Sequence, residues 1–416
     1  MGYLFSFWSS HESNYTQDEV VCQEKIAYNS QIIVKYIEKI IDNIIRVWYE
    51  ASWYYASISV RATLKKRDGR FWAATIRHGS IFDHEESRMR EITYVEAINE
   101  ALMEEMARDE KVFIMGEDVG RGYGGGIFTA TRGLLDKYGP ERVIDTPISE
   151  SAIAGCAIGA ALVGFRPIGE FMFSDFLTIA MDQIVNLAAK MRWSLGGKIG
   201  VPIVYRAAYG AGVGAALQHS QAFEAWFAHV PGLKVVLPST PADAKGLLKA
   251  AIRDDDPVIF LEHKFLYRRL KGPVPTGDYI VPIGKGDIKR EGKDITIIAY
   301  SAMVQRALEV ADILDQRGIS AEVVDPRTLL PLDEEIILKS VEKTGKAVII
   351  HEAPMFGGFG GEIAALLADK GFNYLDGPVK RVGGLFCPIP YSPAMEQLYL
   401  PNVDRILQAV RDLIDF

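Results

Sequence analysis

The feature that most constrains this chain is the regular alternation of strand-like and helix-like segments that begins near Met89. Short apolar runs such as Val112–Met115 and Val258–Leu261 are typical of strands that are buried on both faces. Between such runs, apolar residues recur at helical spacing, for example over Val95–Arg108 and Ala242–Ile252. Because strands that alternate with helices favour parallel pairing, the pattern predicts an α/β fold with largely parallel sheets.

Further segments of both kinds complete a first unit and build a second one. In the first unit, the sequence also predicts helices over Gly133–Tyr138, Ser151–Val163, the region near Phe176–Met191 and Gln221–Val230, and strands over Arg142–Ile144, Pro167–Phe173, Val201–Tyr205 and Lys234–Leu237. A bridge containing Gly and Pro, Lys271–Gly286, follows. The second unit consists of Asp294–Ala299, Ala302–Arg317, Ala321–Val324, Asp333–Thr344, Ala347–His351, a helix near Gly361–Lys370 and a closing helix, Asn402–Ile414. We therefore expect domains at 89–275 and 287–416, joined by a linker at 276–286.

The first 88 residues are a different kind of sequence. They contain none of the 19 prolines and only three of the 38 glycines, although folded domains use both residue types in their turns. We expect residues 1–88 to be an extension of no assigned fold, poorly ordered or partly helical. We also expect a chain that begins at Met89 to assemble and react like the full chain.

Charge and cysteine content exclude several classes of protein. The chain carries 46 Lys and Arg against 54 Asp and Glu, a net charge of −8, which argues against non-specific nucleic-acid binding. We find no membrane span and no secretory signal in the sequence. The three cysteines, Cys22, Cys156 and Cys387, lie far apart and form no CxxC pair. This spacing argues against a zinc site and fits a reducing compartment, so we expect a cytoplasmic protein.

A glycine-rich segment after the strand Val112–Met115 resembles a dinucleotide-binding motif. Residues 120–125 satisfy GxGxxG, and Asp145 follows about twenty residues later. However, Glu117 and Asp118 stand between the strand and the glycines, where their charge would repel a pyrophosphate. The next helix also starts too late for its amides to reach phosphates. A glycine-rich loop is therefore the better interpretation, and a Rossmann site remains the alternative.

Glu150 is a candidate catalytic residue because of its place after a predicted strand. Asp145 closes that strand, Pro147 blocks its extension, and Ser149 is suited to cap the following helix. This arrangement puts Glu150 at the carboxyl edge of a parallel sheet, where α/β proteins place their chemistry. The alternative is an ordinary first-turn glutamate that the helix dipole favours.

His219 is the second candidate. It follows a glycine-rich loop, Gly210–Gly214, and we expect Ser220 to cap the next helix and leave His219 exposed before the positive helix end. That position suits a neutral proton shuttle, and a surface-loop histidine is an equally valid interpretation. The nearby aromatic cluster formed by Phe171, Met172, Phe173 and Phe176 is either core or a flat wall against an aromatic ligand. For His351 and Glu352 we favour a structural or hinge role.

Several stretches, taken in order, resemble one family over 328 of the 416 residues. The matching stretches are Met115–Val119, Asp145–Glu150, Gly169–Met172, Gln218–Gln221, Pro231–Val236, Asp243–Leu248 and Asp325–Thr328. Together they resemble the β subunit of the E1 component of 2-oxo acid dehydrogenase complexes, the pyruvate and branched-chain enzymes. The resemblance implies a thiamine-diphosphate-binding, transketolase-like pyrimidine domain followed by a transketolase C-terminal-like domain.

The resemblance also implies roles for particular residues. In the family, the glutamate that matches Glu150 hydrogen-bonds the aminopyrimidine of thiamine diphosphate, and the aromatic that matches Phe176 stacks on the same ring. Ile148 and Met172 match further cofactor-binding positions. The histidine that matches His219 transfers protons during acyl transfer to lipoamide. A structural monovalent-cation site, with K⁺ as its ion, matches Ile203, Ala251, Asp254 and Asp256.

The chain lacks the GDG motif that binds diphosphate and Mg²⁺ in this cofactor class. In the family that motif lies on an α subunit, so the resemblance implies an α2β2 heterotetramer that shares the cofactor, with Mg²⁺ on the α subunit. It also implies a dihydrolipoyl acyltransferase (E2) as a partner, and neither nucleic acid nor membrane. The alternatives are an acetoin dehydrogenase β subunit and a catalytically silent assembly scaffold.

Overall fold

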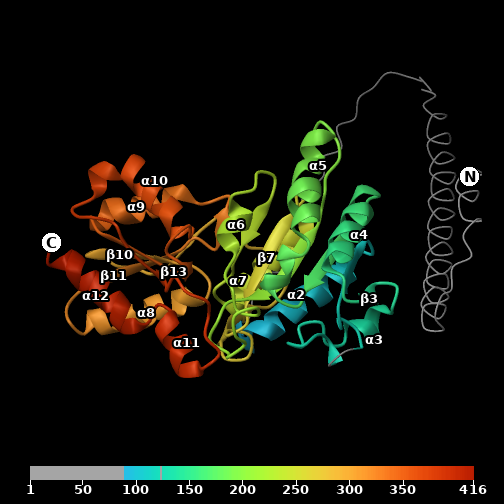
Figure 1. Cartoon of the computed structure of the whole chain (residues 1–416), viewed down its shortest axis with the longest axis horizontal. Coiled ribbons are helices and arrows are strands. Elements are labelled where there is room, and N and C mark those ends of the chain that lie inside the picture. The colour runs from blue at the N-terminus through green and yellow to red at the C-terminus, as the bar shows by residue number, and fades with distance from the viewer. Residues whose placement is uncertain (1–88, 122–123) are drawn as a thin grey trace, which may run out of the picture. The chain divides into compact units, whose positions relative to one another are not determined.

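The structure is a computed structural model that describes residues 89–121 and 124–416 (Figure 1). Our expectations for residues 1–88 lie outside the described residues and stay predictions. In the described ranges, no helix is both long enough and apolar enough to cross a lipid bilayer.

The first sheet has seven strands in the order β12-β6-β7-β5-β4-β2-β3. Every neighbouring pair is parallel except β12–β6. The strands are β2 (Val112–Gly116), β3 (Val143–Asp145), β4 (Arg166–Phe171), β5 (Val204–Tyr209), β6 (Lys234–Val236), β7 (Val258–His263) and β12 (Thr328–Leu330). The predicted parallel α/β unit is therefore present, with strand ends that differ by a few residues from the predicted ones.

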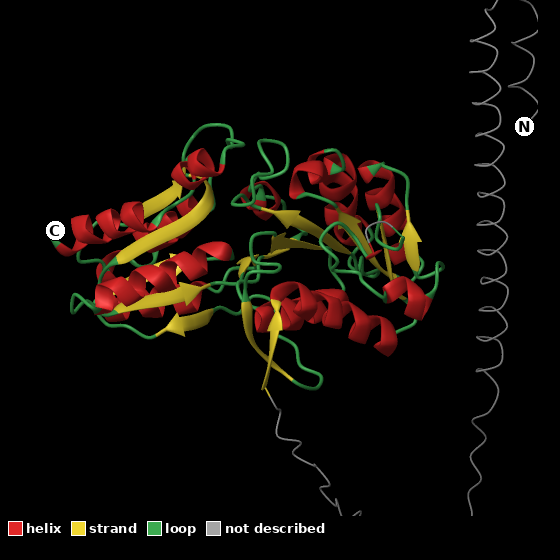
Figure 2. Cartoon of the chain, turned by 90° about the horizontal axis from the view of Figure 1, so that it is seen from below, coloured by secondary structure: helices red, strands yellow, loops and turns green. Residues whose placement is uncertain are grey.

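Helices cover both faces of this sheet (Figure 2). On one face, Val258 and Phe260 of β7 lie in one apolar core with α2 (Tyr94–Arg108) and α7 (Pro241–Arg253). On the other face, Ile259 and Leu261 lie in a second core with α4 (Glu150–Leu162). Since successive side chains of a strand point to opposite faces, a strand covered on both sides must be apolar throughout.

The second sheet has five strands in the order β14-β13-β10-β11-β9, and only the β9–β11 pair is antiparallel. Its strands are β9 (Asp287–Arg290), β10 (Ile295–Ala299), β11 (Ala321–Asp325), β13 (Ala347–Pro354) and β14 (Lys380–Gly384). One face packs on α8 (Ala302–Asp315) and α12 (Val403–Ile414), and the other on α9 (Glu334–Thr344) and α10 (Gly360–Asp369). A short helix, α11 (Pro393–Tyr399), precedes α12.

Five strands of the described residues were not predicted, and three of them, β1 (Met89–Thr93), β8 (Lys271–Pro275) and β12, pair with distant parts of the chain. The bridge contains β8, which pairs with β1 in an antiparallel ribbon. The short β12, although it follows β11 of the second sheet in sequence, adds to the edge of the first sheet by pairing with β6. The other two, β9 and β14, are the two edges of the second sheet. Short edge strands carry too few residues to show a clear hydrophobic period.

Two helix predictions were only partly right, and two predicted caps were wrong. The helix expected near Phe176–Met191 is divided into a 3-10 helix (Ser174–Thr178), a π-helix (Asp182–Ala188) and α5 (Ala189–Ser194). The helix expected over Gln221–Val230 is only α6 (Glu224–Ala228). Ser149 precedes α4 but makes no side-chain cap bond. Ser220 lies too far from α6 to cap it, and its buried hydroxyl has no hydrogen-bond partner in the described part of the chain.

Candidate active site

The candidate site lies at the carboxyl edge of the first sheet, where the segments that follow β3, β4 and β5 meet. Glu150 is the first residue of α4 and is only 6% exposed. The short turn between β3 and α4 fixes it there, because Thr146 N–H donates to the carbonyl of Gly116 at 2.9 Å and extends the parallel pairing of β2 and β3. The predicted place of Glu150 at this edge is therefore confirmed, although the predicted Ser149 cap is not what holds it.

A second carboxyl group lies beside Glu150. Glu117 follows β2, the strand next to β3. Burial raises the pKa of Glu117, and the nearby charges of Glu150 and Asp118 raise it further. Its Oε1 and the hydroxyl of Thr146 are buried without hydrogen-bond partners in the described chain. A carboxyl group with a raised pKa, beside a second carboxyl group and polar atoms without partners, suits the binding of a polar ring with its own donors. Glu117 was not predicted as a site residue, although its place after a strand next to β3 was the signal that it lies near Glu150.

The glycine-rich loop is anchored by Asp145 rather than open for a dinucleotide. The Asp145 carboxylate accepts hydrogen bonds from the main-chain amides of Gly120 at 2.6 Å and Arg121 at 2.9 Å. A Rossmann site needs this acid free for a ribose hydroxyl. Asp145 is instead occupied within the loop, which favours the loop interpretation.

Contacts connect Glu150 to the segment after β4. The hydroxyl of Ser151, next to Glu150, donates to the carbonyl of Ile179 at 2.9 Å. Ile179 directly follows the 3-10 helix that carries Phe176, and Phe176 is half-buried, as is Met172. Ile148 is 83% exposed. The structure therefore brings Glu150 and the Phe176 segment together and leaves Ile148 facing outward at the same edge.

His219 packs into the aromatic cluster. Its ring lies edge-on to Phe173, with centroids 4.7 Å apart, and edge-on to Phe176, with centroids 5.4 Å apart. It is half-buried rather than exposed as predicted. Its neighbour Gln221 is held by Asp175 Oδ1, which accepts from the Gln221 side-chain amide at 2.7 Å. The aromatic cluster is thus divided between the core, which contains Phe171, and a wall at the site, which Phe173 and Phe176 form with His219.

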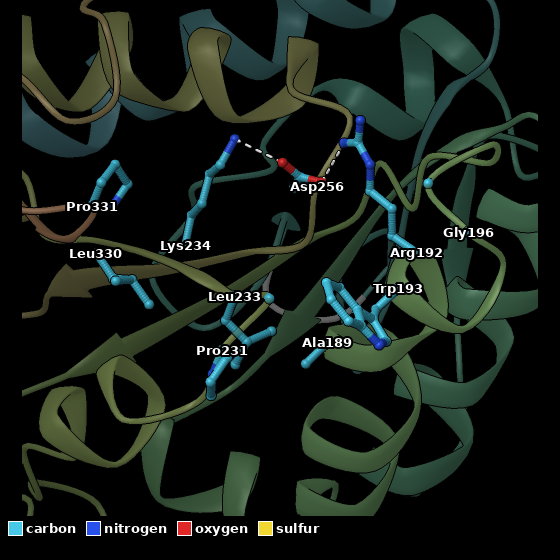
Figure 3. Close-up of a pocket in the computed structure, with 12 residues that line it drawn as sticks. Ala189, Arg192, Trp193, Gly196, Pro231, Leu233, Lys234, Asp256, Leu330 and Pro331 are labelled. Carbon is cyan, nitrogen blue, oxygen red and sulfur yellow. Dashed lines mark hydrogen bonds and ion pairs between the residues drawn. The ribbon is translucent and has the colours of Figure 1, made fainter.

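The four residues predicted for a cation site lie elsewhere. Lys234 starts β6 and Asp256 precedes β7, so both are at the opposite edge of the sheet from Glu150. Lys234 Nζ is 2.7 Å from Asp254 Oδ2 and 3.1 Å from Asp256 Oδ2, and Arg192 also pairs with Asp256. Figure 3 shows Lys234 and Arg192 directed at Asp256 from two sides of a pocket of about 780 Å³.

The main-chain groups of the predicted cation site are also engaged. The carbonyl of Ile203 accepts from Val258 N–H at 2.8 Å, and that of Ala251 accepts from Asp254 N–H at 3.3 Å. Within 89–121 and 124–416, no three His, Cys, Asp or Glu residues gather as a metal site. With both carboxylates paired, a monovalent ion would depend on the remaining lone pairs of the carbonyl oxygens. None of the residues predicted to bind the cofactor lines the pocket in Figure 3.

His351 and Glu352, which are neighbours on β13, have different surroundings and different contacts. His351 is buried against Tyr300 in a stacked arrangement, and burial lowers the pKa of His351 to about 4. It is therefore a neutral core residue, in keeping with the structural role we favoured. Glu352 instead accepts a hydrogen bond from the Ala211 amide in the loop that leads to His219. This contact of Glu352 was not predicted from the sequence.

The structure thus has an acid at the carboxyl edge of one α/β unit, followed in the chain by a second α/β unit, and two family models place such a chain in the transketolase-type class of thiamine-diphosphate enzymes. Residues 90–269 match the family described as the transketolase pyrimidine binding domain, and residues 284–406 match the transketolase C-terminal domain. Among solved structures, a split-gene transketolase described as an inactive beta4 tetramer matches with a TM-score of 0.63 and 26% identity, over 78% of this chain and 99% of that one.

Curated relatives show which group of transketolase-type enzymes the chain is similar to. The 2-oxoisovalerate dehydrogenase subunit beta of Bacillus subtilis is 52% identical over 329 residues, 79% of this chain and 100% of that protein. The pyruvate dehydrogenase E1 component subunit beta-2 of Oryza sativa, a mitochondrial protein, is 50% identical over 77% of this chain and 86% of that one. An acetoin:2,6-dichlorophenolindophenol oxidoreductase subunit beta of Bacillus subtilis is 49% identical over 78% of this chain and 98% of that one. The chain belongs to the family of E1 β subunits of 2-oxo acid dehydrogenase complexes.

Family membership confirms the predicted fold class and the predicted E1 β function, and it excludes the Rossmann alternative. It implies thiamine diphosphate as the cofactor and an E1 α subunit as a partner in a multienzyme complex. The domain limits predicted at 89–275, 276–286 and 287–416 and the roles of individual site residues remain proposals.

Proposed function

We propose that this chain forms one half of an E1 active site that decarboxylates a 2-oxo acid, pyruvate or a branched-chain acid, and passes the acyl group to lipoamide of an E2 acyltransferase. The observation that carries the proposal is the meeting of Glu150, Glu117 and the His219 cluster at one sheet edge. Thiamine diphosphate, when bound, supplies the electron sink that decarboxylation requires.

The residues of this chain have distinct parts in the proposal. Glu150 holds a hydrogen bond to the pyrimidine ring, and its burial keeps water from competing for that bond. Phe176, with Ile148 and Met172, forms the apolar surround of the same ring. His219 exchanges a proton during acyl transfer, and its packing against Phe173 and Phe176 fixes the direction of its ring nitrogens.

We further propose the α2β2 assembly, with Mg²⁺ held by the α subunit. A stripe of small residues on α4, including Gly155 and Gly159, supports close approach of a partner helix. A Cβ atom at Gly159 would meet nothing within 4 Å, and one at Gly155 only Gln183 Cγ at 3.8 Å. Internal packing therefore does not require glycine at these positions. A K⁺ ion near Ala251, and a cytoplasmic location, are further proposals that rest on the family pattern and on the cysteine spacing.

The test is to co-express the chain with its α subunit and to measure thiamine-dependent decarboxylation with a dye as electron acceptor, for pyruvate, branched-chain 2-oxo acids and acetoin. Glu150→Gln should lower the rate by ~100-fold or more, because removal of one positioned hydrogen-bonding group from an active site typically costs about that much. The matched control is Glu362→Gln, another first-turn glutamate but an exposed one on α10, and it should keep full activity.

The same assay decides between the alternatives. Cleavage of acetoin without decarboxylation of 2-oxo acids would assign the acetoin function. Full activity of Glu150→Gln would contradict the proposed site, and inactivity of the wild-type complex toward all three substrates would favour a scaffold.

A further inference from the structure

The loop between β5 and His219, residues 210–214, is held at its main chain by buried side chains. The carbonyl of Gly210 accepts from Lys264 Nζ, and the amide of Ala211 donates to Glu352 Oε1. The amide of Gly214 donates to Glu396 Oε2 at 3.0 Å. We call Lys264, Glu352 and Glu396 the loop clamp.

The clamp comes largely from the second α/β unit. Glu352 lies on β13 and Glu396 on α11, whereas Lys264 directly follows β7. All three are buried, with 4% or less of each residue exposed. Glu352 is itself fixed, because its Oε2 lies 2.6 Å from His263 Nε2. Buried charged groups that bind main-chain atoms hold them strongly, since losing the bond would leave a charge unpaired.

Apolar contacts and glycines fix the same loop. The side chain of Ala211 is buried in a small cluster with Ile389, Tyr399 and Leu400 of the second unit. Gly210 has a φ of +86°, and a Cβ atom there would lie 2.1 Å from His263 Nε2. Glycine is therefore required at position 210, because the backbone there is left-handed and His263 leaves no room for a Cβ atom.

The main chain at His219 has little support of its own. Its main-chain N–H makes only a long bond of 3.4 Å to the carbonyl of Ala216, and no regular element contains it. The His219 ring packs against the Phe173 ring, and Lys264 Nζ lies 5.7 Å from the centroid of the Phe173 ring. The clamp thus reaches His219 both through the loop and through Phe173.

The charge of Lys264 is balanced inside this cluster. Burial lowers the pKa of Lys264 to about 8, while the facing carboxylates of Glu352, Asp175 and Glu396 act in the opposite direction. Removal of one carboxylate therefore weakens both a loop bond and the charge balance of the clamp.

We propose that Lys264, Glu352 and Glu396 are positioning residues for His219, through which the second domain controls acyl transfer. The inference rests on the proposed role of His219. A displacement of His219 should slow the step that uses its proton and leave the steps that use Glu150 unchanged. Misplacement of a catalytic group by about 1 Å is enough to lower a rate by ~100-fold.

The test uses the full complex with its α subunit and two assays: dye-coupled decarboxylation, and acyl transfer to a lipoyl domain. Glu396→Met removes the acceptor for Gly214, and we expect acyl transfer to fall ~10-fold or more while dye reduction stays within about twofold. Glu396→Gln keeps an acceptor oxygen and should restore most of the acyl transfer. Glu322→Met is the control for loss of a buried carboxylate, and it should leave acyl transfer unchanged. Glu322 is fully buried in the second sheet and accepts from the Gly292 amide at 3.2 Å and from Ser340 and Lys343.

A double-mutant cycle with His219→Ala completes the test. If the clamp acts through His219, Glu396→Met should cause no further loss of acyl transfer in the His219→Ala background. An equal loss in that background, an equal fall in both assays, or no loss at all overturns the positioning role. If the Glu396→Met chain does not assemble with the α subunit, Lys264→Met replaces it in the same double-mutant cycle, with the same expected and contradicting results.

Failure of the proposed function has a different signature. Full acyl transfer by His219→Ala would remove the proposed role of His219, and dye reduction by Glu150→Gln at the wild-type rate would remove that of Glu150. Neither result depends on the clamp variants.

Discussion

Glu150 and His219 lie at the same edge of the first sheet but are positioned in opposite ways. Glu150 opens a regular helix, and the turn that places it is bonded to the neighbouring strand β2. His219 lies in an irregular segment, and its loop is bonded to residues 141 and 182 positions away along the chain. The position of the first residue is a local property, whereas the position of the second is a property of the two domains together.

Because Glu150 and His219 are held in different ways, substitutions elsewhere in the molecule should affect them differently. Because regular elements open cooperatively and irregular loops open locally, disturbance of the second domain should reach His219 before it reaches Glu150. A change near Glu150 should lower dye reduction and acyl transfer together, and a change near His219 should lower acyl transfer alone.

Gly210→Ala should have the largest effect on stability. The new Cβ would lie 2.1 Å from His263 Nε2 and would require a left-handed backbone, so we expect a loss of about 3 kcal/mol or more and a selective loss of acyl transfer. Gly214→Ala is the control. It also has a positive φ, but its Cβ would meet only the Tyr391 carbonyl at 3.8 Å, so about 1 kcal/mol is expected. Thermal unfolding of the complex measures both, and equal losses would contradict a tight fit at Gly210.

Glu224→Gln should make the stability of the folded protein less sensitive to pH. Glu224 begins α6 and accepts a 2.9 Å bond from the Tyr300 hydroxyl of the second domain. Burial raises the pKa of Glu224 to about 7. The folded protein then holds a proton that the unfolded chain loses near pH 4.5, so this group lowers stability as pH rises from about 4.5 to 7.

We expect Glu224→Gln to be up to about 3 kcal/mol more stable than wild type at pH 8 and close to wild type at pH 4.5. Thermal unfolding of both proteins across this range gives the difference. A difference that does not grow with pH would show that Glu224 titrates normally in the folded protein.

Sequence reasoning succeeded where the signal was local and failed where it was not. The place of Glu150 followed from Asp145 and Pro147 only a few residues before it. The edge strand β12 has only three residues, too few for a period-2 pattern, and its partner β6 is far away in sequence. No pattern in the sequence joined Glu352 or Glu396 to the loop at 210–214, because such contacts exist only once both domains are packed.

Asp145→Ala tests how the segments around Glu150 are held by residues close to them in the first sheet. The Asp145 carboxylate binds the amides of Gly120 and Arg121 but is exposed, so its removal should cost about 1–2 kcal/mol. Since the freed loop lies next to Glu117 and Glu150, dye reduction and acyl transfer should fall by the same factor. Asp145→Asn keeps an acceptor oxygen and should lose less in both assays. A loss confined to acyl transfer would show that the loop serves His219 instead.

Ser149→Ala should have the smallest effect, although the sequence favours Ser149 as a helix cap. In the structure Ser149 makes no side-chain bond to α4, so the change should alter stability by less than about 0.5 kcal/mol. Asn402→Ala is the positive control, because Asn402 Oδ1 accepts from Arg405 N–H at 2.9 Å and caps α12. Loss of that bond should cost about 1 kcal/mol. If Ser149→Ala costs as much as Asn402→Ala, then Ser149 caps α4 in solution. The local support of Glu150 would in that case include the cap as well as the pairing of β2 with β3.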